Sequence, residues 1–209
     1  KSEAILLIEV DGRGAEVQED AELIRKIAVK NNASALNGAA NEVEANVLKT
    51  ARRSAFSALA RRMPTTILED ATVPRSELPV MIERVAKAAK MFDVMIGNFG
   101  HAGDGNLHPT CLTDERDSKA LERVHRAFDF IFNEAIKLGG TITGEHGTGL
   151  AKKHFLEAVA GPAGVDMMKK IKLAIDHNNI LNPGKIFTIS PKCEGHMPTN
   201  REQIKDFHA

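Results

Sequence analysis

Two glycine-rich segments of the chain hold the side chains best suited to catalysis or metal binding. Residues 97–108 (GNFGHAGDGNLH) contain His101 and His108, and residues 139–149 (GGTITGEHGTG) contain Glu145 and His146. Glycine tolerates backbone conformations that other residues avoid, so each segment can turn sharply and direct its polar side chains to one point. Imidazole and carboxylate groups are good ligands for zinc, manganese or iron, and three protein ligands leave positions open for a substrate. The pattern favours a catalytic metal site over a structural one.

A simpler interpretation of these residues stays open from the spacing alone. A single histidine is more often a structural or surface residue than a ligand, and glycine clusters often form tight turns with no further role. The spacing matches no closed zinc-finger pattern, which argues against structural zinc. The glycines form no Rossmann fingerprint, phosphate-binding P-loop or GxSxG nucleophile turn. Arg52 and Arg53 lie within a helical pattern and are either part of a solvated helix face or a clamp for a substrate carboxylate.

The elements that would position these groups alternate between helix and strand without a regular repeat. Apolar β-prone runs predict strands, and apolar residues spaced three or four apart predict helices. Ser76 is the expected cap of one helix, with Pro79 in its first turn. Strands are predicted at residues 4–10, 65–68, 94–99 and 107–112, and helices at 19–29, 42–63, 76–92, 117–138 and 163–176. This order favours an α+β fold in which helices pack on one face of an antiparallel sheet.

Composition and charge argue against several classes of protein. Lys plus Arg equals Asp plus Glu at 28 each, so the formal net charge is zero, and the basic excess of a nucleic-acid-binding protein is missing. No apolar run approaches the roughly 20 residues that a membrane-spanning helix needs. Cys111 and Cys193 form no disulfide framework, which indicates a reducing compartment. We expect a cytoplasmic protein, free or peripheral at the inner membrane, with one domain at residues 1–189 and a polar tail at 190–209.

Three motifs, in this order, resemble the C-terminal domain of the FAD-linked oxidases. They are GNFGHAGDGNLHPT, GGTITGEHGTGLAKK and NNILNPGKIF, and the segments EDATVPRSELP and AILLIEVDG are also similar to the family. The family includes the glycolate oxidase FAD subunit, D-lactate dehydrogenase and D-2-hydroxyglutarate dehydrogenase. The resemblance covers residues 4–187 and implies a ferredoxin-like α+β cap domain that follows an N-terminal FAD-binding domain. These residues hold no counterpart of that FAD-binding domain, so we expect one part of a longer enzyme, inactive by itself.

The resemblance also implies roles for particular residues. The family's metal ligands fall on His101, His108 and Glu145. Its catalytic base falls on His146, beside that glutamate. Its substrate-carboxylate arginine falls on Arg52 within KTARRSAF, although Lys49 stands where the family often has tryptophan. Asn182, in the NPGK segment, matches a position close to the flavin.

Two further positions bear on the substrate that the resemblance implies. The hydroxyglutarate branch has a hydroxyl group one helical turn after the arginine and a lysine just before the Asp-x-x-x-Pro segment, where this chain has Phe56 and Leu68. The difference favours a small 2-hydroxy acid similar to glycolate or lactate. The implied reaction transfers a hydride to FAD, with an iron–sulfur subunit or a quinone as the electron acceptor. A flavin-independent metal hydrolase and a non-catalytic cap-like binding module are the alternatives.

Overall fold

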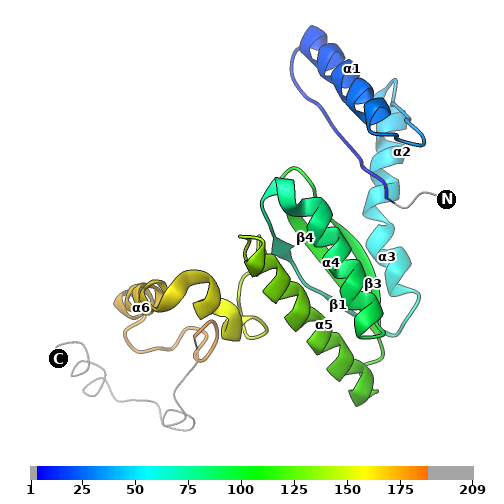
Figure 1. The fold of residues 1–209 in the computed structure, drawn as a ribbon. Coiled ribbons are helices and arrows are strands. Elements are labelled where there is room, and N and C mark those ends of the chain that lie inside the picture. Colours follow the sequence, from blue (N-terminus) through cyan, green and yellow to red (C-terminus); the bar gives the residue numbers. More distant parts are fainter. Residues whose placement is uncertain (1–3, 188–209) are drawn as a thin grey trace. The chain divides into compact units, whose positions relative to one another are not determined.

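The computed structural model describes residues 4–187, which divide into two compact units (Figure 1). The first unit extends to Arg61 and the second begins at Arg62. All four strands belong to the second unit, together with three of the six α-helices in the described part of the chain.

The first unit is helical. Its helices are α1 (Gly14–Lys30), α2 (Glu42–Arg53) and α3 (Ala55–Ala60). The strand predicted at residues 4–10 is wrong: these residues form no strand and nearly all are exposed. A strand needs a hydrogen-bonding partner, and the described residues of this unit contain no other strand. The single helix predicted at 42–63 is interrupted at Ser54, whose hydroxyl donates a hydrogen bond to the carbonyl of Ala51 at 3.1 Å.

The second unit is built on an antiparallel sheet. Its strands are β1 (Thr65–Leu68), β2 (Ala71–Thr72), β3 (Met95–His101) and β4 (Asn106–Thr113). β4 is central, with β3 along one side and β1 and β2 in line along the other. Thr141 forms an antiparallel bridge with Thr72 on the outer edge of β2. A ferredoxin-like sheet has its fourth strand at this edge, so here that strand is reduced to a single bridge.

Two helices cover one face of this sheet. They are α4 (Leu78–Met91) and α5 (Ser118–Lys137), which pack against each other (Figure 1). Their buried residues recur every three or four positions, as the sequence pattern predicted. The core that they form with the sheet includes Met81, Val85, Leu107, Phe128 and Ile131. The predicted α+β architecture, with helices on one face, is confirmed.

The ends of the helices show where local sequence signals succeeded and failed. Asp117 caps α5 by accepting hydrogen bonds from the backbone N–H groups of Lys119 and Ala120 at 3.0 and 3.1 Å. Ser76 does not cap α4. It lies inside a 3₁₀ turn, η1 (Arg75–Glu77), and α4 begins at Leu78, directly after this turn. Pro79 lies in the first turn of α4 as predicted, where its missing N–H costs nothing.

The C-terminal helix is longer than its sequence pattern predicted. A 3₁₀ turn, η2 (Lys153–Phe155), leads into α6 (Leu156–Ile175), whereas the prediction began at residue 163. The helix is broken at Gly161, which has φ 69°, and Pro162 starts its second half. The predicted tail at 190–209 lies outside the described residues. No helix among residues 4–187 is both long enough and apolar enough to cross a membrane.

Candidate metal centre

The sheet face opposite α4 and α5 presents the two loop-flanking histidines together. Side chains alternate along a strand. Leu107 and Cys111 of β4 pack in the helix-covered core, so His108 points to the other face. In the β3–β4 register, His101 lies across from Asn106, two positions from His108. His101 and His108 are therefore diagonal neighbours on one face, and their ring centroids are 5.3 Å apart.

Glycine is required where the hairpin between these strands comes close to other backbone. A Cβ on Gly100 would lie 2.9 Å from the Cα of Leu107, closer than van der Waals contact allows. Gly105 has φ +74°, and a Cβ there would overlap the carbonyl oxygen of Val73. These glycines were predicted to form a turn. They allow the close backbone approach that places His101, at the end of β3, near the start of β4.

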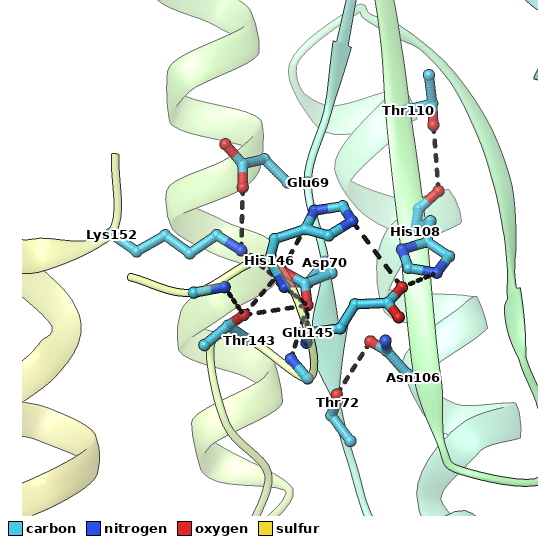
Figure 2. A network of polar contacts seen from close by, with 12 residues as sticks. Glu69, Asp70, Thr72, Asn106, His108, Thr110, Thr143, Glu145, His146 and Lys152 are labelled. Atoms are coloured by element: carbon cyan, nitrogen blue, oxygen red, sulfur yellow. Dashed lines mark hydrogen bonds and ion pairs between the residues drawn. The ribbon is translucent and has the colours of Figure 1, made fainter. Parts of the chain in front are cut away.

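The second glycine-rich segment brings its carboxylate to the same face. Oε1 of Glu145 lies 3.0 Å from Nε2 of His108 and 3.9 Å from Nε2 of His101. His101, His108 and Glu145 each offer one ligand atom, and these atoms lie within 4.8 Å of one another. Figure 2 shows the Glu145 carboxylate between His108 and His146. The three residues predicted as metal ligands are therefore brought together by the fold.

His146 lies against the same group. Its ring stacks on that of His108 with 5.3 Å between centroids and 18° between planes. Nδ1 of His146 is 3.6 Å from Oδ1 of Asp70, and Nε2 is 3.9 Å from Oε1 of Glu145. The side chain of His146 is 35% exposed. One nitrogen of this imidazole thus faces a buried carboxylate while the other faces the candidate ligands.

Asp70 organises the segment that carries Glu145 and His146. Its carboxylate is fully buried. It accepts hydrogen bonds from the backbone N–H groups of Gly144, Glu145 and His146 at 2.7, 2.8 and 3.2 Å, and from the hydroxyl of Thr143 at 3.1 Å (Figure 2). Burial alone would raise the pKa of Asp70, but these backbone donors and the ammonium of Lys152 hold it well below its usual range.

Lys152 completes this buried cluster. Its Nζ lies 2.5 Å from Oδ1 of Asp70, 2.9 Å from the Asp70 carbonyl oxygen and 3.0 Å from Oε2 of Glu69. The Lys152 residue is 1% exposed. No role for Asp70, Lys152 or Glu69 was predicted from the sequence. Two adjacent carboxylates that interrupt the β-prone run TTILEDATV were the available signal, because such groups cannot enter a core unpaired.

The donor set fits a divalent transition metal. Burial, the largest cause, lowers the pKa of His108, which keeps its imidazole in the neutral form that binds metals. Nδ1 of His108 is buried and has no hydrogen-bond partner among the described residues. Zinc holds its ligands at about 2.0–2.2 Å. Tetrahedral geometry at this bond length puts donor atoms about 3.3–3.6 Å apart, so the 3.9 Å separation of Glu145 from His101 must shorten, whereas the 3.0 Å separation from His108 need not.

The two remaining predicted site residues lie elsewhere. Arg52 is exposed in the last turn of α2, in the first unit. Asn182 is exposed in the second unit, has φ 49°, and accepts a hydrogen bond from Nζ of Lys185 at 3.1 Å. The roles predicted for Arg52 in substrate binding and for Asn182 beside the flavin stay predictions.

Comparison with known proteins identifies the family. The family described as FAD linked oxidases, C-terminal domain, matches residues 1–186. The chain is 54% identical over 186 residues to glycolate oxidase subunit GlcD of Bacillus subtilis, an alignment covering 89% of this chain and 40% of that protein. It is 34% identical over 206 residues to GlcD of Escherichia coli K12, covering 94% of this chain and 41% of that protein.

A eukaryotic relative aligns over the same portion. The chain is 32% identical over 201 residues to the probable mitochondrial D-lactate dehydrogenase of Danio rerio, covering 95% of this chain and 39% of that protein. The chain thus spans about two fifths of the length of these relatives. With the family matched over residues 1–186 and the fold in agreement, the chain belongs to the family of FAD-linked oxidase C-terminal domains.

Proposed function

We propose that this chain is the substrate- and metal-binding part of a flavin-dependent 2-hydroxy-acid dehydrogenase, acting on a small acid similar to glycolate or D-lactate. The observation that carries the proposal is the convergence of His101, His108 and Glu145 beside His146 on one face of the sheet. The relatives named glycolate oxidase subunit and D-lactate dehydrogenase support the class of substrate. An FAD-binding domain is the partner that this function requires.

The chemistry divides between the cofactors and the side chains of this chain. FAD supplies the hydride acceptor, and a divalent ion such as zinc, manganese or iron supplies Lewis acidity toward the substrate hydroxyl. In oxidation to a 2-oxo acid the substrate loses a hydride from its carbinol carbon and a proton from its hydroxyl. The proposed recipient of that proton is Nε2 of His146, because Nδ1 faces the Asp70 carboxylate. General-base help of this kind is typically worth about 10²–10⁴-fold.

Arg52 is the proposed partner of the substrate carboxylate. A guanidinium donates two parallel hydrogen bonds to a carboxylate, which fixes orientation as well as position. The support for this role is the sequence match of KTARRSAF, not a contact in the structure. Asn182 is proposed to lie beside the flavin on the same kind of support. An iron–sulfur subunit or a quinone is the proposed electron acceptor.

The first experiment measures metal content of the purified chain. The His101→Ala/His108→Ala double variant is compared with wild type, and His125→Ala/His177→Ala serves as a matched control because both of these histidines are exposed. We expect nearly one equivalent of a transition metal in wild type and in the control, and almost none in the site variant. Equal metal content in all three proteins would rule out this metal site.

The second experiment tests turnover when the chain is joined to its FAD-binding domain. We expect His146→Ala to lower kcat for glycolate or D-lactate by about 10²–10⁴-fold while metal content is retained. Arg52→Lys should raise KM, since a lysine lacks the planar two-pronged donor. Unchanged kinetics in His146→Ala would exclude it as the base. Hydrolytic activity without FAD would favour a metal hydrolase, and metal binding without either activity would favour a binding module.

A further inference from the structure

We infer that the buried Asp70–Lys152 pair is a positioning device that holds the Glu145–His146 turn over His108. Neither residue is a catalytic residue, because neither is among the candidate ligands and both are almost wholly buried. This inference rests on the proposed function for its catalytic meaning. Its structural content, that one carboxylate sets the geometry of the turn, is independent of which substrate is used.

One carboxylate accepts most of the hydrogen bonds that the turn donates. Three consecutive N–H groups, from Gly144 to His146, and the Thr143 hydroxyl all point at Asp70. The Thr143 hydroxyl in turn accepts a hydrogen bond from the N–H of Gly147 at 2.8 Å. Glycine-rich backbone has many accessible conformations, and ordering each residue costs conformational entropy. Asp70 supplies a single acceptor that offsets this cost for several residues at once.

The segment that carries Glu145 and His146 is attached to Asp70 at both ends. Thr143 binds the carboxylate at the start of the segment, and Lys152 binds it at the end. The backbone of Lys152 is also tied to the segment, because its N–H donates a hydrogen bond to the carbonyl oxygen of Thr148 at 3.1 Å. Residues 143–152 therefore form a loop that is closed through the buried carboxylate of Asp70, with Glu145 and His146 inside it.

Asp70 lies next to His108 in the sheet register. Leu68 pairs with Thr110 and Ala71 pairs with Leu107, a register that puts Asp70 across from His108. The carboxylate that holds the turn thus lies between β1 and β2, beside the strand that carries a candidate ligand. This explains how Glu145, on a loop, comes within 3.0 Å of Nε2 of His108, on a strand. It also explains the 3.6 Å approach of Asp70 to Nδ1 of His146.

The test separates positioning from stability by using both members of the pair. Asp70→Asn keeps the shape of the side chain but gives up its charge, and Lys152→Met keeps the length of the side chain without its ammonium. Lys152→Met leaves the buried Asp70 charge without its partner. Removing both Asp70 and Lys152 avoids this, and leaves only Glu69, whose side chain is 17% exposed, without its ion pair. The Asp70→Asn/Lys152→Met double variant should therefore regain thermal stability relative to Lys152→Met, while the turn is left with one neutral amide oxygen, a weaker acceptor than the charged carboxylate.

Asp176→Asn is the matched control. Asp176 also accepts two backbone N–H groups, from Ile180 and Leu181, and contacts the ammonium of Lys172. It organises the segment after α6 and is not one of the candidate ligands. Zinc affinity is measured by competition with a chromophoric chelator, stability by circular dichroism, and exchange of the amide hydrogens of Gly144, Glu145 and His146 by nuclear magnetic resonance.

We expect Asp70→Asn and the double variant to bind zinc about 10–100-fold more weakly, the usual effect of losing a partner that orients a ligand. Amide exchange in the turn should accelerate at least about 10-fold in both variants. Asp176→Asn should retain wild-type zinc affinity and turn exchange. Wild-type affinity in Asp70→Asn, or recovery of affinity together with stability in the double variant, would overturn the inference.

The amide-exchange measurement distinguishes failure of this inference from failure of the proposed function. If wild type binds no zinc, the proposed metal site is wrong, and the exchange comparison still decides whether Asp70 holds the turn. Turn amides that exchange equally in wild type, Asp70→Asn and the double variant would overturn the inference even if zinc binds normally.

Discussion

Oε1 of Glu145 lies 3.0 Å from Nε2 of His108 but 3.9 Å from Nε2 of His101. The two histidines also differ in exposure: the His108 side chain is 6% exposed and the His101 side chain is 50% exposed. His108 lies within the central strand β4, whereas His101 is the last residue of β3. The candidate centre therefore combines one buried ligand within a central strand with one exposed ligand at the end of β3, where the β3–β4 loop begins.

The two histidines should contribute unequally to metal affinity. A ligand held in place by the fold loses less conformational freedom on binding than an exposed one. We expect His108→Ala to weaken zinc binding by more than the roughly 100-fold that loss of an outer partner costs at most. His101→Ala should weaken binding less. Isothermal titration of each single variant checks the order, and a larger loss for His101→Ala would contradict it.

Gly144 should be intolerant of any side chain. A Cβ there would lie 2.7 Å from Cγ of Asn106, whose Oδ1 accepts a hydrogen bond from the Thr72 hydroxyl at 3.0 Å. We expect Gly144→Ala to lower the free energy of unfolding by about 1–3 kcal/mol, as overpacking usually does. Gly103→Ala is the control, because its Cβ would meet nothing within 4 Å. Urea unfolding of both variants gives the comparison, and equal stabilities would show that the turn relaxes freely.

Asp176 should make stability depend on acid pH. The Lys172 ammonium, with the backbone donors of Ile180 and Leu181, lowers the pKa of Asp176 to about 2 from its ordinary 3.8. Between these values the unfolded chain binds more protons, so this carboxylate stabilises the fold above about pH 4 and ceases to do so near pH 2. Asp176→Asn should be less stable than wild type at pH 6, with the difference vanishing near pH 2.

The control for the acid-pH experiment is Asp166→Asn. Asp166 pairs with Lys170 in the same helix, but its side chain is 60% exposed, and an exposed pair contributes little. Thermal unfolding from pH 2 to pH 7 should show only a small difference between this variant and wild type. An equal loss of stability in Asp166→Asn and Asp176→Asn would mean that the charge of the carboxylate causes the effect, and that the hydrogen bonds of Asp176 to Ile180 and Leu181 do not.

Cys111 should be inert in the folded protein. Its side chain is fully buried in the core, and burial raises the pKa of its thiol to about 12. Because the thiolate is the reactive form, both access and ionisation oppose modification. In a Cys193→Ser background, we expect no reaction with Ellman's reagent at pH 8 until guanidinium unfolds the chain. Rapid reaction of the native protein would show that the core opens locally around β4.

Elements with strong local patterns could be predicted from the sequence. The periodic apolar residues of α4 and α5 and the β-prone runs of β1, β3 and β4 were predicted correctly because these signals arise within each segment. The break at Ser54 and the early start of α6 were missed, since helix ends depend on single hydrogen bonds and on one glycine, Gly161. Residues 4–10 have strand-like composition but no strand partner among the described residues.

The sequence by itself determined the donor types of the candidate centre, because His101, His108, Glu145 and His146 are recognisable from residue type and glycine context. Only the tertiary structure decided how they meet. The register of β3 on β4 places the two histidines on one face, and the buried Asp70–Lys152 pair attaches the turn that carries Glu145. The physical reason is that register and burial are set by contacts between distant segments, and no local pattern encodes which donors a buried carboxylate will accept.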